Sequence, residues 1–210
     1  MARAILVIGQ SGSGKSRSLK NFKANEVGVI QCVPKDLPFR NSLKTIVTTD
    51  YQKIKDVLTK SKAKTLVIDD ANYLMTCEYV YSQVTGYDKF NNIATNFYDL
   101  INYIQNFVQE DKTVYILMHE DVNDVTGVVK PKTVGKMLDE KVCVEGLFTI
   151  VLRCVNNLGE HKFFVNNNGC AKSPEDMFES QSIENDLKYV DDVIREYYGI
   201  NDKKGEQTND

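Results

Sequence analysis

The sequence predicts an α/β protein with a mostly parallel central sheet flanked by helices and an antiparallel hairpin near the C-terminus. Two observations predict this fold. Short apolar runs rich in β-branched residues alternate with segments whose apolar residues recur at helical spacing, and the first run leads into a glycine-rich loop. The runs that we expect to form strands are 4–8, 27–32, 44–48, 65–69, 113–118, 148–154 and 162–165.

Helices are expected between these runs. Residues 16–22 follow the glycine-rich loop, and Asp50 stands where an N-cap would precede a second helix. The long apolar stripe from Phe90 to Val108 is the clearest helical pattern in the chain. A last helix begins near Leu187 and is expected to stop at Gly199.

Length and composition favour one domain of ordinary size. The chain has 210 residues and a formal net charge of −3, so any contact with nucleic acid must be local. We expect residues 1–200 to form the domain and residues 201–210 to be a disordered polar tail. No segment resembles a membrane span or a leader, which favours a cytoplasmic protein without a membrane partner. The odd, scattered cysteines indicate reduced thiols: Cys32, Cys77, Cys143, Cys154 and Cys170.

Residues 9–16 form a complete G-x-x-x-x-G-K-S motif between an expected strand and an expected helix. In this context the loop backbone can surround phosphate oxygens, Lys15 can reach the β- and γ-phosphates, and Ser16 can ligate Mg²⁺. The alternative is a glycine-rich turn with a chance lysine. We therefore expect ATP and Mg²⁺ as ligands, with these nucleotide-binding residues: Gly9, Gln10, Ser11, Gly12, Ser13, Gly14, Lys15, Ser16 and Arg17.

Two acids end the apolar run 65–69. Asp69 is expected to hold the Mg²⁺ shell together with Ser16, since an apolar strand ending in an acid is the usual partner of the glycine-rich motif. Asp70 stands where many ATPases place the carboxylate that activates water. It could instead cap a helix beginning at Ala71.

His119 ends the next apolar run and is expected to lie beside Asp69, near the γ-phosphate, where it could sense that group. A hydrogen-bonded histidine at a strand end is the alternative. His161 falls in the expected hairpin turn, and we expect it to be simply exposed.

Residues 120–135 are polar and contain Gly127 and Pro131, which predicts a long mobile loop. Lys130, Lys132 and Lys136 lie toward its end and are candidate contacts for a DNA backbone, or they belong to an ordinary solvated loop. The tyrosines between residues 73 and 87 could stack on unpaired bases, although core or interface positions are favoured.

Lys172 lies on a short turn before Ser173-Pro174. Such a lysine could enter the nucleotide site of a neighbouring subunit and act there in catalysis, or it could be an exposed turn residue. The chain contains few arginines, and Arg153 is the only late-sheet candidate for an arginine finger.

Several stretches together make the chain resemble the phage P-loop nucleotide-binding proteins, a family of AAA/RecA-like ATPases that includes Sak-type single-strand annealing recombinases. The resemblance covers roughly residues 4–198, and its most specific parts are Lys130-Pro-Lys-Thr-Val-Gly-Lys136 and Ala171-Lys-Ser-Pro174. The other matching stretches are residues 9–16, 67–75, 86–90, 118–120, 137–138, 145–148 and 177–178.

The resemblance implies a RecA-like P-loop core in which Lys15, Ser16 and Asp69 bind the nucleotide. It also implies that the loop after His119 binds DNA and that Lys172 acts across a subunit interface. One departure is that the glutamate used as base by RecA, on the strand before the metal-ligand strand, is not found. Asp70 could replace it, or hydrolysis could be slow or stimulated by DNA.

The expected function is therefore that of a RecA-like ATPase acting on single-stranded DNA in recombination or annealing. It would work as a homo-oligomer, a ring or a filament, with a single-stranded-DNA-binding protein as a possible further partner. An AAA-type helicase loader or an ATP-dependent assembly module is the alternative. A nucleotide kinase is disfavoured because such kinases close an arginine-rich lid over the phosphates.

Overall fold

Within residues 1–200, which the computed structural model describes, the chain forms a nine-stranded sheet in the order β3-β2-β4-β5-β1-β7-β8-β9, with β6 paired to β5. Neighbouring strands are parallel from β3 to β7 and antiparallel from β7 to β9. The strands are β1 (Arg3–Gly9), β2 (Val27–Gln31), β3 (Lys44–Val47), β4 (Thr65–Asp69), β5 (Thr113–Val122), β6 (Val129–Pro131), β7 (Ile150–Asn157), β8 (Glu160–Phe164) and β9 (Ser182–Glu184).

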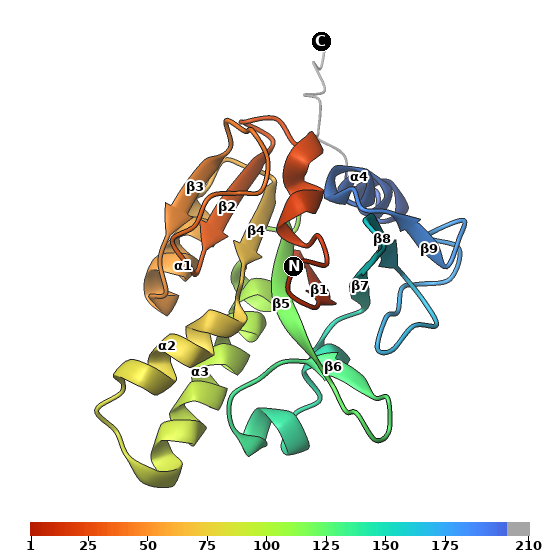
Figure 1. Cartoon of the computed structure of the whole chain (residues 1–210). Coiled ribbons are helices and arrows are strands. Elements are labelled where there is room, and N and C mark those ends of the chain that lie inside the picture. The colour runs from red at the N-terminus through yellow and green to blue at the C-terminus, as the bar shows by residue number, and fades with distance from the viewer. Residues whose placement is uncertain (201–210) are drawn as a thin grey trace.

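Helices cover both faces of the sheet and make a three-layer structure (Figure 1). One face packs against α1 (Tyr51–Lys60), α2 (Asn72–Tyr81) and α3 (Gly86–Phe107). The other face packs against a 3-10 helix (Ser16–Asn21) and α4 (Leu187–Tyr197). A π-helix (Met137–Lys141) and a 3-10 turn (Val144–Leu147) connect β6 to β7.

The two cores follow from the alternation of side chains along each strand. In β1, Leu6 and Ile8 belong to the core beneath α1–α3, whereas Ile5 and Val7 belong to the core beneath α4. Because both faces are buried, the parallel strands read as continuous apolar runs rather than as alternating patterns.

The predicted fold class is confirmed at the level of a mostly parallel sheet flanked by helices, with an antiparallel C-terminal hairpin. The seven expected strands form with small shifts at their ends, and Asp50 caps α1 by accepting a hydrogen bond from the Lys53 amide. The β7–β8 hairpin turns at Leu158-Gly159, both with positive φ. The expected tail, residues 201–210, lies outside the described residues.

The prediction of a long loop over residues 120–135 is wrong. Strand β5 continues to Val122, and β6 returns beside it as a hairpin with Val122 opposite Val129. Asn123 closes the turn because its side-chain oxygen accepts from the amides of Val125 and Thr126. The sequence pattern did not predict this hairpin because the segment is mostly polar, and within β6 the buried residues are Val129 and Pro131.

The candidate site residues lie together at the carboxyl ends of the parallel strands. Strand β5 lies between β1 and β4, so that Gly9 is paired with His119 while Gln31 is paired with Asp69. The carboxyl ends of parallel strands meet at this edge, where ligands bind in open α/β sheets. Within residues 1–200, no helix has both the length and the apolar character that crossing a membrane requires.

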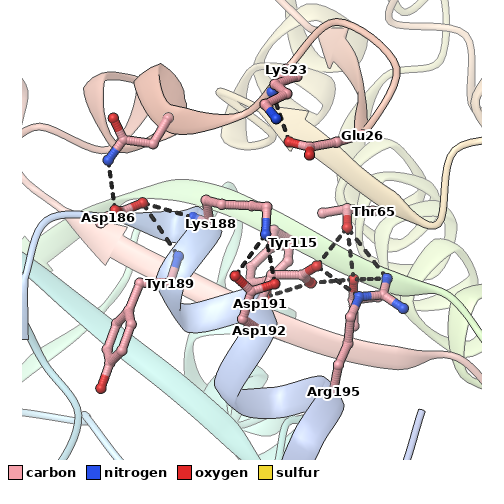
Figure 2. Close-up of polar contacts among 12 residues, drawn as sticks. Lys23, Glu26, Thr65, Tyr115, Asp186, Lys188, Tyr189, Asp191, Asp192 and Arg195 are labelled. Atoms are coloured by element: carbon pink, nitrogen blue, oxygen red, sulfur yellow. Dashed lines mark hydrogen bonds and ion pairs between the residues drawn. The ribbon is translucent and has the colours of Figure 1, made fainter. Parts of the chain in front are cut away.

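At the amino ends of β4 and β5, a buried carboxylate on α4 holds this helix against the sheet through hydrogen bonds (Figure 2). Asp191 is 3% exposed, so its charge must be satisfied by protein groups and not by water. Its oxygens accept four hydrogen bonds: from Thr65 at 2.7 Å, Thr113 at 2.5 Å, Tyr115 at 2.9 Å and Arg195 at 2.8 Å.

Replacing Asp191 by alanine is expected to lower the free energy of unfolding by about 3–5 kcal/mol, because Arg195 and three hydroxyls lose a buried acceptor. Denaturant unfolding followed by circular dichroism measures the change. Asp192→Ala is the matched control, since the exposed Asp192 forms an ion pair with Lys188 at the surface and its loss should cost less than about 1 kcal/mol. Equal losses in the two variants would contradict the structural role of Asp191.

Candidate functional site

The glycine-rich loop is held tightly beneath the β7–β8 hairpin. A Cβ on Gly9 would stand 2.4 Å from the Cys154 carbonyl oxygen, and a Cβ on Gly14 would stand 2.7 Å from His161 Nδ1. Gly14 also has a φ of 109°, which side chains rarely allow. Gly9 is therefore required for space, and Gly14 for both space and backbone conformation.

Lys15 is buried and folds back over its own loop. Its Nζ donates to the carbonyl oxygens of Gly9 at 2.7 Å and Gln10 at 2.8 Å. Burial lowers its pKa, while the carboxylates of Asp69 and Asp70 oppose that shift. Lys15 is therefore a cation held at the centre of the loop by carbonyl groups.

Ser16 and Asp69 meet at the mouth of the loop. Ser16 Oγ donates to Asp69 Oδ1 at 2.9 Å, and Asp69 is fully buried. Burial raises the pKa of Asp69, and the charge of Asp70 adds to this effect. Asp69 Oδ2 has no hydrogen-bond partner among residues 1–200. A buried, unpaired carboxylate oxygen beside a serine hydroxyl fits a Mg²⁺ ion with its water shell.

No group of three or more histidine, cysteine or acidic residues gathers as a metal cluster within residues 1–200. A Mg²⁺ ion bound by Ser16 and Asp69 would need its remaining ligands from water and phosphate, which is how this ion is usually held.

Asp70 is not a side-chain cap. It has a φ of 58°, and its buried carboxylate forms an ion pair with Lys35 and lies 3.7 Å from His119 Nε2. The backbone carbonyl of Asp70, not its side chain, accepts from the Tyr73 amide at the start of α2. The carboxylate is therefore turned toward the pocket and away from α2.

His119 lies on the strand beside β4, as the sequence predicted, between the glycine-rich loop and Asp70. It does not end that strand, because β5 continues to Val122. Its ring packs edge-on against Tyr73. Burial lowers the pKa of His119, and the Lys15 ammonium lowers it further. Both effects favour the neutral form of the imidazole.

The expectation for His161 was wrong. It lies on β8 rather than in the turn, is only partly exposed, and its Nδ1 is 2.7 Å from the Ser13 carbonyl oxygen. The β7–β8 hairpin folds back over the glycine-rich loop, and no local sequence pattern predicts this arrangement. His161 thus forms part of the site.

A pocket of ≈ 370 Å³ lies at the glycine-rich loop, with Asp69 buried behind its lining residues. Sequence reasoning had placed most of its residues in the site but had missed Lys35, Asp36 and Pro38 on the β2–β3 connection, in addition to His161. The expected members are Ser11, Gly12, Gly14, Lys15, Ser16, Arg17, Asp70 and His119. Gln10 contributes its carbonyl to Lys15 from outside the lining, and Ser13 is buried beneath the loop.

Arg153 does not point freely into solvent. Its guanidinium makes two hydrogen bonds to the buried carboxylate of Glu120, at 2.8 and 3.1 Å, and another to Asn168. This bidentate pair joins β7 to β5. An arginine held in this way is a poor candidate for a finger that reaches another subunit.

Lys172 lies away from the pocket of its own chain. Its backbone amide and carbonyl both form hydrogen bonds with Val151 on β7, and its side chain is partly exposed.

Of the three candidate DNA-binding lysines, Lys132 and Lys136 follow β6 and are exposed, whereas Lys130 on β6 forms an ion pair with Asp139. The Lys132 amide donates to the His119 carbonyl at 2.8 Å, so the base of the hairpin touches the site.

Comparison with protein-family models and with curated proteins finds no match for this chain. The resemblance to phage P-loop proteins therefore depends on the sequence motifs alone.

The charges around His119 lead to a titration prediction. We expect its pKa, followed by NMR of the imidazole protons, to lie below the ordinary value of about 6.5. Lys15→Met should raise this pKa because a neighbouring positive charge is removed. Lys44→Gln, on the exposed edge strand β3, is the control and should leave it unchanged. A fall in the pKa of the Lys15 variant would refute the arrangement.

Proposed function

We propose that the chain is a RecA-like P-loop ATPase that binds Mg²⁺-ATP at residues 9–16. The observation that carries this proposal is the 2.9 Å contact between Ser16 Oγ and Asp69 Oδ1 at the mouth of the loop that holds Lys15. In P-loop proteins a serine hydroxyl and a strand-end aspartate share the metal in this way. The placement of β5 between β1 and β4 also agrees with a RecA-like core.

Each residue has a physical task in this proposal. Lys15 would exchange two carbonyl partners for β- and γ-phosphate oxygens, a stronger charge-assisted contact. Ser16 and Asp69 would hold Mg²⁺, which neutralises phosphate charge. A second hollow of ≈ 530 Å³ is also lined by Arg17 and His161, and it offers room for the ribose and base.

Asp70 is our candidate for the group that accepts a proton from the attacking water. The neighbouring strand β2 ends in Gln31 beside Asp69, and an amide cannot accept that proton. Of the two carboxylates that line the pocket, Asp36 is exposed, whereas Asp70 is buried beside His119, which could report the γ-phosphate. The arrangement agrees with the absence of a RecA-type glutamate.

The arginines favour an ATPase over a nucleotide kinase. Arg17 lines the pocket, but Arg153 is paired with Glu120 and Arg195 with Asp191. An arginine-rich lid would need several free guanidinium groups near the phosphates.

We further propose that the ATPase acts on single-stranded DNA as an oligomer, as the resemblance to phage annealing proteins suggests. The exposed Lys132 and Lys136 follow a hairpin connected directly to His119, which supports a DNA contact there. Lys172, because it lies outside its own pocket, is available to reach a neighbouring subunit.

Lys15→Ala should abolish detectable Mg²⁺-ATP binding while the fold survives. The substitution removes a charge-assisted phosphate contact, and the loop carbonyls that held the ammonium become accessible to water. Titration with a fluorescent ATP analogue and thermal unfolding measure the two properties. Wild-type affinity in this variant would rule out the proposed nucleotide site.

Asp70→Asn should leave Mg²⁺-ATP bound but slow hydrolysis by roughly a hundredfold or more, as removal of a general base typically does. Phosphate release under saturating ATP measures the rate. His161→Gln, which changes another residue of the same pocket, serves as a comparison that retains Asp70. If turnover in the Asp70 variant matched wild type, the base would lie elsewhere.

Replacing Lys130, Lys132 and Lys136 together by glutamine should weaken single-stranded DNA binding and flatten its salt dependence. Every lysine–phosphate interaction that the substitutions remove should reduce the log–log salt slope by about 0.7. Lys130 is expected to contribute least because Asp139 already neutralises it. An unchanged slope, measured by fluorescence anisotropy, would place the DNA site elsewhere or argue against one.

A further inference from the structure

Lys35 is a pocket residue to which neither the sequence nor the P-loop motif assigns a role. It lies on the β2–β3 connection, lines the same pocket as Lys15 and Ser16, and forms an ion pair with Asp70. Its side chain is 46% exposed, whereas that of Asp70 is 4% exposed. The buried carboxylate is therefore compensated by a cation that itself reaches solvent.

The backbone that carries Lys35 is fixed. Gln31, at the end of β2, donates from its side-chain amide to the Lys35 carbonyl oxygen at 2.9 Å. On the far side of this contact, Leu37 and Leu43 are buried in the core. The main chain is thus anchored on both sides of Lys35, while the long, partly exposed side chain can reorient without moving the connection.

The electrostatics favour such a reorientation when a triphosphate enters. Asp70 offers Lys35 a single negative charge, whereas a terminal phosphate carries close to two and presents three acceptor oxygens. The other lysine that lines the pocket, Lys15, would meet the phosphates from the glycine-rich loop, so that Lys35 would add a second positive charge from the β2–β3 connection. Arg153 is held by Glu120 and does not line the pocket.

We propose that Lys35 is a specificity-determining residue that recognises the terminal phosphate of a nucleoside triphosphate, leaving Asp70 for that phosphate when the nucleotide binds. The inference rests on the proposed ATPase function. A diphosphate would leave the Lys35–Asp70 ion pair intact. A triphosphate would open it and leave the Asp70 carboxylate unpaired beside the site of hydrolysis, which couples recognition of ATP to release of the base.

The test compares dissociation constants for Mg²⁺-ADP and a non-hydrolysable Mg²⁺-ATP analogue by calorimetry. Lys35→Gln should weaken binding of the triphosphate analogue roughly ten- to a hundredfold, the usual range for one charge-assisted contact, and change ADP binding little. Lys35→Arg should restore most of the preference. Lys44→Gln, an exposed lysine at the far end of the same connection, should match wild type.

A double variant separates phosphate recognition from simple support of Asp70. If Lys35 contacts the phosphate, Lys35→Gln weakens triphosphate binding in the Asp70→Asn background as well. If Lys35 only compensates Asp70, its effect disappears in that background, and the inference is wrong. An unchanged ratio of ADP to triphosphate affinity in Lys35→Gln also overturns it. Failure of the wild-type chain to bind either nucleotide would instead overturn the proposed function.

Discussion

Two adjacent buried carboxylates at the end of β4 are the constraint on which the candidate site depends. Asp69 and Asp70 are both almost fully removed from water, and charged groups so placed are stable only when donors and cations surround them. Ser16 approaches Asp69 from the glycine-rich loop, and Lys35 approaches Asp70 from the β2–β3 connection. Elements far apart in the chain are therefore drawn together by one electrostatic requirement.

The same requirement explains the close packing of the glycine-rich loop. To bring Ser16 to Asp69, the loop passes beneath the β7–β8 hairpin, where Gly9 meets the Cys154 carbonyl and Gly14 meets His161. The hairpin is therefore a wall of the site and not a distant addition to the sheet. Burial of Cys154, which lies on β7 against the loop, raises the pKa of its thiol to about 11 and keeps the thiol protonated and unreactive.

Strand β5 links the site to the rest of the molecule. Its central part is buried between β1 and β4, His119 and Glu120 lie near the pocket edge, and its last residues pair with β6. Glu120 is clamped by Arg153 of β7, and the His119 carbonyl accepts from the Lys132 amide. Strand β5 therefore joins His119 directly to the β5–β6 hairpin as one continuous strand.

The sequence by itself determined the elements and the chemistry that local pattern encodes. Continuous apolar runs identified the buried strands, Asp50 identified the start of α1, and the G-x-x-x-x-G-K-S motif with Asp69 identified residues that the fold does bring within 2.9 Å. Only the tertiary structure decided which residues from outside these motifs join them. Lys35 and His161 carry no local signal, because their positions depend on how a connection and a hairpin fold back over the sheet edge. The hairpin at residues 120–131 was not predicted for a related reason, since strand pairing between mostly polar segments leaves little hydrophobic periodicity to detect.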